Sequence, residues 1–218
     1  MNNLVNLEIS NHIATVALNR PDKKNALSKD MFNAIANVGE NLKHENDVRV
    51  IILTGSGSDF CSGLDTSTFS EWATDFQKVR NDLTSRPAGE NASWFQKPCY
   101  VWQEIEVPVI AAIKGVAFGA GIQLALAADF RITHPDSKFS VMESKWGIIP
   151  DLGITQNLPK LTRADIAKEL IMTGRIFDGN EALRLGLVTK VSKEPLITAK
   201  EYAELLLKKS PDVLKGAK

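Results

Sequence analysis

The chain has 218 residues, which is enough for one domain with a sizeable core and no disulfide bonds. It carries 26 basic and 26 acidic side chains, and 44% of its residues are hydrophobic, as in ordinary globular proteins. Zero net charge disfavours nucleic acid as a partner. Two cysteines, Cys61 and Cys99, do not make a disulfide framework and fit a reducing cytoplasm. The longest apolar run, residues 115–128, is too short to span a bilayer, and no signal peptide is visible, so we expect no membrane partner.

The first half of the chain begins with a predicted hairpin in residues 4–19, which turns at Ser10 and Asn11. A loop rich in helix breakers follows. Ser28 then predicts the N-cap of a helix over residues 29–44, because apolar side chains recur there at helical spacing. Residues 48–53, VRVIIL, predict a buried strand, and a glycine- and serine-rich loop comes after it.

The second half opens with residues 66–92, which give weak helical signals. VPVIAAIKG predicts another buried strand, and a glycine-rich turn leads from it into a helix. Two short strands are expected around FRITHP and KFSV, before the loop ESKWGIIPDLG. The rest alternates helices with one strand near residues 187–191. This order predicts a mixed α/β fold, and the hairpin disfavours a simple doubly wound sheet.

Several common active-site motifs are absent from the sequence. GSGSDF and GAGIQL both lack the third glycine of a dinucleotide fingerprint, and no phosphate-loop lysine or G-x-S-x-G turn occurs. The histidines His12, His44 and His134 are far apart in unrelated contexts. Metal, nicotinamide and serine-nucleophile chemistry therefore have no support, and we expect no metal site.

Two loops each follow a buried strand and carry small residues, FCSGLD at 60–65 and KGVAFGAG at 114–121. Small side chains let a backbone come close to a ligand. The second loop also opens a helix, whose first N–H groups lack partners within the helix. Two such donors aimed at one point would form an oxyanion hole. From the residues alone, both loops also fit plain tight turns.

Four motifs in this order, LNRPDKKNAL, FCSGLD, VPVIAAIKGVAFGAG and FSVMESKWGIIPDLGITQNLPKL, resemble the crotonase superfamily, that is, the enoyl-CoA hydratase/isomerase family. The match covers about residues 4–191. The resemblance implies a crotonase-like spiral of repeated ββα units with C-terminal helices. It implies a core at 1–192 that binds acyl-CoA and the start of a C-terminal helical segment at 193–218. Because members usually continue with helices that cap the pocket, it leaves open whether this segment is truncated.

The resemblance also implies roles for the two loops. The oxyanion donors would be the backbone N–H groups of Leu64 and Ala120, with alanine tolerated if it is helical. Coenzyme A would follow the stretches 24–26 and 62–65. The implied contacts are Lys24, Ala26, Ser62, Gly63 and Asp65. Lys23 and Lys24 fit either a phosphate contact or plain solvated lysines.

The implied acid–base residue is Glu143, which matches the second glutamate of the family's hydratases. Gln123 stands where their first glutamate would be; it can orient a water or a carbonyl but cannot exchange a proton near neutral pH. Asp151 matches a carboxylate of the family's dienoyl-CoA isomerases, although these carry aspartate at the position of Gln123. From the residues, Gln123 also fits a buried amide satisfied by backbone, and Asp151 fits the cap of a helix beginning near Leu152.

Burial beside apolar neighbours is expected to raise the pKa of these carboxyls, because it disfavours their charged form. The same segment of chain that follows the first loop is rich in aromatic residues. They fit plain core better than an acyl tunnel: Trp72, Phe76, Trp94, Phe95, Tyr100 and Trp102.

The resemblance favours an enzyme that moves a double bond in an enoyl- or dienoyl-CoA. It would be a lyase or an isomerase of the kind that acts in fatty acid β-oxidation. The alternatives are a 2-trans-enoyl-CoA hydratase that uses Glu143 with Asp151, and a CoA-binding scaffold without turnover. RNA binding, known for one branch, is disfavoured by the neutral charge. No cofactor is implied beyond the coenzyme A of the substrate. The family suggests a homotrimer or a dimer of trimers, and we expect a cytoplasmic location.

Overall fold

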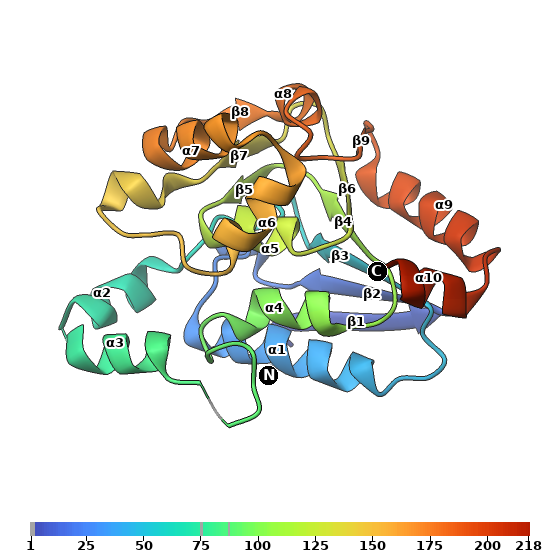
Figure 1. The fold of residues 1–218 in the computed structure, drawn as a ribbon, viewed down its shortest axis with the longest axis horizontal. Helices are drawn as coiled ribbons and strands as arrows, with labels where there is room; N and C mark the ends of the chain where they lie inside the picture. The colour runs from blue at the N-terminus through green and yellow to red at the C-terminus, as the bar shows by residue number, and fades with distance from the viewer. Residues whose placement is uncertain (1–2, 75, 87) are drawn as a thin grey trace.

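The computed structural model describes residues 3–74, 76–86 and 88–218 and consists of two β-sheets with helices around them (Figure 1). The larger sheet has six strands in the order β1-β2-β3-β4-β6-β9. Its first pair is the predicted hairpin, antiparallel, and the later strands all join in parallel. Its strands are β1 (Val5–Ser10), β2 (Ile13–Leu18), β3 (Val50–Gly55), β4 (Val109–Ile113), β6 (Phe130–Thr133) and β9 (Lys190–Val191).

The smaller sheet is made of the strands β5 (Val116–Phe118), β7 (Lys138–Ser140) and β8 (Phe177–Asp178), in that order. Its first two strands come directly after β4 and β6 in the chain, so each successive unit gives one strand to each sheet. This repetition is the expected spiral of ββα units, and the mixed α/β fold class is confirmed. The loop after β3 continues the pattern through a parallel bridge between Cys61 and Ala117.

The helices surround these sheets (Figure 1). Ser28 caps the first of them as predicted, since its Oγ accepts a hydrogen bond from the Met31 N–H at 3.3 Å. The helices are α1 (Lys29–Lys43), α2 (Thr66–Thr74), α3 (Phe76–Thr84), α4 (Lys97–Glu104), α5 (Ala120–Leu126), α6 (Ile154–Leu161), α7 (Ala164–Thr173), α8 (Gly179–Arg184), α9 (Pro195–Leu207) and α10 (Pro211–Ala217), with short 3₁₀ turns η1 (Pro21–Lys23) and η2 (Met142–Trp146). No helix within the described ranges is long and apolar enough to cross a membrane.

Alternating side chains divide the large sheet between two apolar clusters, because successive side chains of a strand point to opposite faces. Ile52, Ile110 and Ile132 pack with Ala199 and Ala203 of α9. Neighbouring strand residues on the other face join the main core, which also holds α1, α4 and α5. Both faces of β3 are therefore buried, as is usual for parallel strands covered on each side.

The structure corrects some predicted boundaries. The hairpin turns at Asn11 and His12, which have φ of 50° and 64°, one residue later than expected. Both residues therefore adopt the left-handed backbone of a two-residue hairpin turn. The strand expected at 48–53 is β3, which begins at Val50, and the strand expected at 187–191 is only the two-residue β9. The sequence did not predict β8, which is too short to show a pattern.

Candidate active site

The two glycine-containing loops lie against each other, as the sequence suggested. The Cys61 N–H donates to the Val116 carbonyl at 2.9 Å, and the Phe118 N–H donates back to the Cys61 carbonyl at 3.0 Å. Gly63 has φ of 99°, and a Cβ at this position would lie 2.7 Å from the Phe118 carbonyl oxygen and 3.7 Å from the Ala120 nitrogen. A side chain at position 63 is therefore excluded twice, by conformation and by space.

The N–H groups of Leu64 and Ala120 lie on these two touching loops. Within the described part of the chain, neither donates a hydrogen bond to the protein. Ala120 is the first residue of α5 and is helical, which is the condition under which alanine was expected to be tolerated. The backbone thus presents two donors without protein acceptors, one of them in the electropositive first turn of a helix.

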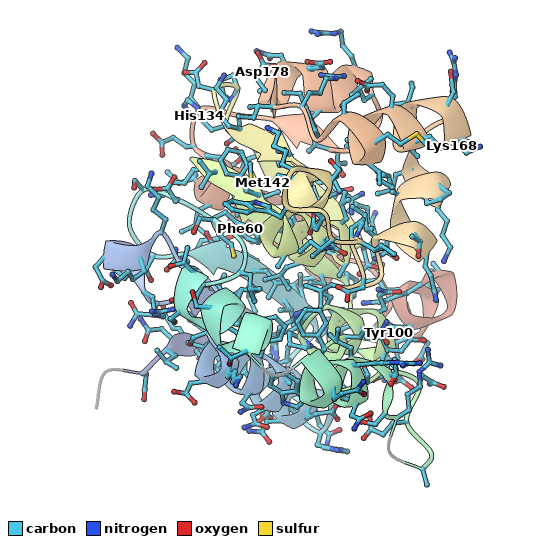
Figure 2. All side chains as sticks on the ribbon, turned by 90° about the vertical axis from the view of Figure 1, so that its left-hand side faces the viewer. Phe60, Tyr100, His134, Met142, Lys168 and Asp178 are labelled. Carbon is cyan, nitrogen blue, oxygen red and sulfur yellow. The ribbon has the colours of Figure 1, made fainter. Side chains whose placement is uncertain are left out.

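Glu143 of η2 lies beside the second loop; Figure 2 labels its neighbour Met142 and marks the first loop with Phe60. The Glu143 side chain is 7% exposed. Its Oε1 accepts a hydrogen bond from Gln123 Nε2 at 2.7 Å and would lie 3.4 Å from a Cβ at Gly119. Its Oε2 is buried and has no hydrogen-bond partner among the described residues. One oxygen of this carboxyl is held, and the other is left for a ligand.

Gln123 and Asp151 both belong to this group. The Leu152 N–H donates to Gln123 Oε1 at 2.9 Å, so the amide links Glu143 to the backbone next to Asp151. The loop after η2 folds back, as Gly147 and Pro150 predicted. Asp151 is not a helix cap, because α6 begins at Ile154 and its N-cap is Gly153. The capping interpretation of Asp151 is therefore wrong.

Burial changes the acidity of both carboxyls. It raises the pKa of Glu143, while hydrogen bonds from the residue's own backbone N–H and from Gln123 lower it and the charge on Asp151 adds a smaller rise. Burial raises the pKa of Asp151 to about 6. A carboxyl with its pKa moved towards neutrality exchanges protons more readily at physiological pH than an ordinary surface carboxylate. The expected direction of the pKa shift is thus present at both residues, although the apolar residues between them in sequence, Trp146, Ile148 and Ile149, are exposed and do not form a shell around them.

The stretches expected to contact coenzyme A are joined to each other. The Ser62 N–H donates to the Lys24 carbonyl at 2.9 Å, and the Leu27 N–H donates to the Gly63 carbonyl at 2.8 Å. Lys24 is exposed, with Nζ 3.5 Å from Asp59 Oδ2. These contacts join the two stretches next to Leu64, with Lys24 exposed, Ser62 partly exposed, and Ala26, Gly63 and Asp65 buried beneath them.

Ala26 and Asp65 are both held by Arg20. Arg20 donates to the Ala26 carbonyl at 2.7 Å and pairs with Asp65 at 2.9 Å. Hydrogen bonds from Ser67, together with Arg20, hold the pKa of Asp65 below its usual value. The Asp65 carboxylate is thus engaged by Arg20 and Ser67, and its N–H donates to the Leu27 carbonyl at 3.0 Å, so both groups are held by the protein.

The sequence interpretation missed Arg20 and gave Asn25 no role of its own within the stretch 24–26. Asn25 is fully buried and donates to the carbonyls of Ser56 at 3.0 Å and Asp59 at 2.7 Å, while its Oδ1 accepts from the Arg20 N–H at 2.8 Å. Both residues lie within the motif LNRPDKKNAL, of which only the part from Lys24 to Ala26 was given a role. That motif was the available signal.

The aromatic residues are mostly core, as favoured. Trp102 and Phe95 are buried, and Phe32 of α1 stacks on Phe95 with ring centroids 5.1 Å apart. Trp94 stacks on Phe32 at 5.7 Å and donates to Asn33 at 2.6 Å. The side chains of Trp72 and Phe76 lie outside the described residues.

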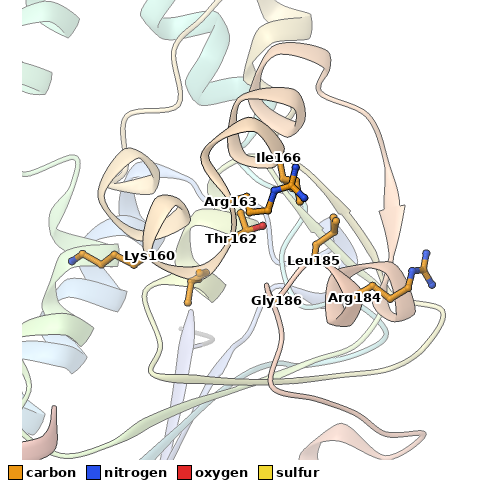
Figure 3. Close-up of a pocket in the computed structure, with 8 residues that line it drawn as sticks. Lys160, Thr162, Arg163, Ile166, Arg184, Leu185 and Gly186 are labelled. Atoms are coloured by element: carbon orange, nitrogen blue, oxygen red, sulfur yellow. The ribbon is translucent and has the colours of Figure 1, made fainter.

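A separate hollow of about 580 Å³ lies on the surface where α6 ends, α7 begins and α8 ends (Figure 3). It is lined by Lys160, Leu161, Thr162, Arg163, Ile166, Arg184, Leu185 and Gly186, none of which was a predicted site residue. In the described ranges of the chain, no three histidine, cysteine, aspartate or glutamate side chains are grouped to hold a metal ion. The candidate active site is therefore the group of side chains around Glu143, and not this hollow.

Comparison with known proteins agrees with this geometry. The sequence pattern of the enoyl-CoA hydratase/isomerase family matches residues 8–218. The chain belongs to the enoyl-CoA hydratase/isomerase family. It is therefore an acyl-CoA enzyme of a family that contains both lyases and isomerases.

Relatives within the enoyl-CoA hydratase/isomerase family differ in the reaction they are named for. The chain is 38% identical over 206 residues to a peroxisomal Δ(3,5)-Δ(2,4)-dienoyl-CoA isomerase of Arabidopsis thaliana, covering 92% of this chain and 74% of the relative. It is 34% identical over 221 residues to a short-chain-enoyl-CoA hydratase of Clostridium acetobutylicum, covering 100% and 80%. A solved enoyl-CoA hydratase from Bacillus anthracis superposes with a TM-score of 0.87 at 32% identity, covering 98% and 80%.

Proposed function

We propose that this enzyme moves a double bond in an enoyl- or dienoyl-CoA thioester. The observation that carries the proposal is the Glu143 carboxyl, which is buried beside the second loop. One of its oxygens is bound by Gln123, and the other has no hydrogen-bond partner among the described residues. Glu143 lies against Gly119, next in the chain to Ala120, and the loop of Leu64 packs on this segment through Gly63; we therefore propose the N–H groups of Leu64 and Ala120 as its partners in catalysis. The relative named as a dienoyl-CoA isomerase supports this choice of reaction.

The proposed reaction begins with the thioester oxygen accepting hydrogen bonds from the N–H groups of Leu64 and Ala120. Glu143 removes a proton from a carbon next to the unsaturated system, and the electron pair moves towards this oxygen to form an enolate. Two preset donors stabilise the developing charge, each by roughly 3 kcal/mol in comparable sites. Glu143 returns this proton at another carbon, or an initially protonated Asp151 gives its own proton there and the proton on Glu143 then restores it, so the bond moves without any oxidant or added water.

Coenzyme A is proposed to follow the surface formed by Lys24, Ala26, Ser62, Gly63 and Asp65. The hydrogen bonds between these stretches join them next to Leu64. Lys24 is the exposed cation of this surface and is proposed to approach a phosphate. No further cofactor is proposed, and the trimeric assembly and cytoplasmic location stay predictions.

Hydration of a 2-trans-enoyl-CoA is the second candidate. It is favoured by Asp151, whose pKa is raised to about 6 by burial and whose charge acts on Glu143. Two interacting carboxyls whose pKa values are both raised can activate a water and deliver a proton. The relative named as a short-chain-enoyl-CoA hydratase supports this candidate.

The test is product analysis over a panel of 2-enoyl-, 3-enoyl- and 3,5-dienoyl-CoA esters, with wild type and Glu143→Gln. We expect a product of unchanged mass with a shifted double bond, whereas a gain of one water marks hydration. Because general acid–base catalysis contributes about 10²–10⁴-fold, Glu143→Gln is expected to lose that much kcat. Glu8→Gln, on the exposed face of β1, is the matched control and should keep wild-type kcat.

Unimpaired turnover by Glu143→Gln would remove the proposed mechanism. A wild-type protein that binds CoA esters but turns over none of the panel would instead indicate the scaffold. Product mass separates the two candidate reactions in the same experiment.

A further inference from the structure

One peptide unit next to the site is held from both sides by glutamine side chains. The carbonyl of Asp151 and the N–H of Leu152 belong to the same planar group. Gln96 Nε2 donates to this carbonyl at 3.1 Å, and Gln123 Oε1 accepts from this N–H at 2.9 Å. The peptide that carries Asp151 is therefore fixed at both its polar ends.

The second glutamine also decides how Glu143 is oriented. A backbone N–H can only donate, so the amide oxygen of Gln123 must face Leu152. Its nitrogen must then face Glu143 Oε1, at 2.7 Å, and this oxygen accepts the bond best when it carries no proton of its own. The proton that Glu143 takes up is consequently carried on Oε2, the buried oxygen with no partner among the described residues.

The first glutamine ties this arrangement to a helix. Gln96 is the N-cap residue of α4, its N–H donates to the Ser93 carbonyl at 3.0 Å, and its Oε1 accepts from the Ser93 N–H at 3.3 Å. Asp151 itself lies in irregular chain between Pro150 and Gly153. Its position therefore depends on the hydrogen bonds to its own peptide rather than on a helix or strand.

We propose that Gln96 is a positioning residue, which together with Gln123 clamps the Asp151–Leu152 peptide and so sets where the Asp151 carboxyl stands relative to Glu143. The inference rests on the proposed function for its catalytic meaning, since it assumes that both carboxyls act on the substrate. Neither glutamine has to touch the thioester for this role. Loss of the clamp should therefore slow the proton transfers and leave substrate binding nearly unchanged.

The test compares Gln96→Met and Gln96→Glu, two variants of similar size that both lose the donor at neutral pH, with Gln123→Met. Gln156→Met, an exposed glutamine on α6, is the matched control. Because a displacement of 1 Å costs roughly 10²-fold in rate, we expect about a ten-fold fall in kcat for both Gln96 variants. For Gln123→Met, which also removes the hydrogen bond to Glu143, we expect kcat to fall by about 10²-fold. In all three, KM should change by less than about two-fold, because uniform binding is untouched.

Hydrogen exchange of the Leu152 amide gives a readout that does not depend on turnover. We expect faster exchange in Gln123→Met, which removes the acceptor, and a smaller increase in both Gln96 variants, while Gln156→Met stays as wild type. Melting curves identify any variant that has lost its fold. Gln96→Glu is included because glutamate has the same shape as glutamine, so it removes the donor without changing the packing.

The outcomes separate the two proposals. A wild-type protein without turnover on any enoyl-CoA would overturn the proposed function, and the exchange measurement would still test the clamp. If wild type is active and folded Gln96→Glu keeps its kcat within two-fold, Gln96 is not a positioning residue. Unchanged Leu152 exchange in Gln123→Met would contradict the clamp itself.

Discussion

At the level of single residues, the two oxygens of the Glu143 carboxyl have different surroundings, unlike those of a carboxylate on the protein surface, which both face water. Gln123 occupies one oxygen of Glu143, and this oxygen lies close to Gly119, whose φ of 51° favours glycine and where a Cβ would be 3.4 Å away. The other oxygen faces no protein donor in the described ranges. An unsatisfied buried carboxyl is costly to a protein unless a ligand makes use of it. Function, rather than stability, accounts for this arrangement.

Asp151 carries a similar cost, which gives a prediction about pH. Its pKa is about 6 in the folded protein, against an ordinary value of 3.8, so the folded state binds more protons between these values. The stability contributed by its protonated form is complete below about pH 4 and is lost as the pH rises through about 6. Asp151→Asn has no charge to bury. We therefore expect it to melt at a higher temperature than wild type above pH 6 and at nearly the same temperature at pH 4.

Melting curves of wild type and Asp151→Asn between pH 4 and 8 measure this difference. Asp22→Asn, an exposed aspartate in η1, serves as the control and should give a difference that does not grow over this range. A melting difference for Asp151→Asn that stayed constant from pH 4 to 8 would show that burial does not disfavour the Asp151 charge. Activity of the same variant should fall, since a second acid has been removed.

At the scale of elements, the site depends on the contact between the first loop and α5. A Cβ at Gly121 would lie 2.3 Å from the Cys61 carbonyl oxygen, which is backbone and cannot turn aside. Gly121→Ala must therefore push α5 from the loop that carries Leu64. We expect a loss of about 1–3 kcal/mol in the free energy of unfolding, as for other overpacked positions, together with a lower kcat.

Gly216→Ala is the matched comparison, because a Cβ in this glycine of α10 meets no atom within 4 Å. It should leave kcat unchanged and stabilise the protein slightly, by about 0.5–1 kcal/mol, since alanine is the better helix former. Urea unfolding and turnover of both variants make the check. Wild-type kcat in Gly121→Ala would mean that the spacing of the two loops is not critical.

Much of the element structure followed from local patterns, and parts of it did not. Ser28 and the apolar spacing after it predicted α1 because capping and periodicity are local signals. The two-residue strand β8 carries no such signal, because its pairing partner decides it. In the site, Glu143, Asp151 and Gln123 were placed together through resemblance. Gln96 is 55 residues from Asp151 in sequence, and nothing near it marks that contact.

At the scale of the whole molecule, the large sheet is buried by different segments on its two faces. The main core covers one face, and α9 covers the other through Ala199 and Ala203. Phe130 of β6 packs edge to face on Tyr202 of α9, with centroids 5.1 Å apart. Because the sheet is shared, α9 should unfold together with the spiral even though the sequence assigned it to a separate C-terminal segment.

A pair of matched isoleucine variants tests this cooperativity. Ile51 and Ile110 are both fully buried on adjacent parallel strands, but Ile51 faces the main core and Ile110 faces α9. Truncation to alanine at either position should cost about 2–5 kcal/mol, from lost burial and the cavity left behind. If the sheet joins both clusters into one unit, each variant should shift a single urea transition without changing its slope. Two separate transitions in Ile110→Ala, followed by circular dichroism, would instead show that α9 detaches while the spiral stays folded.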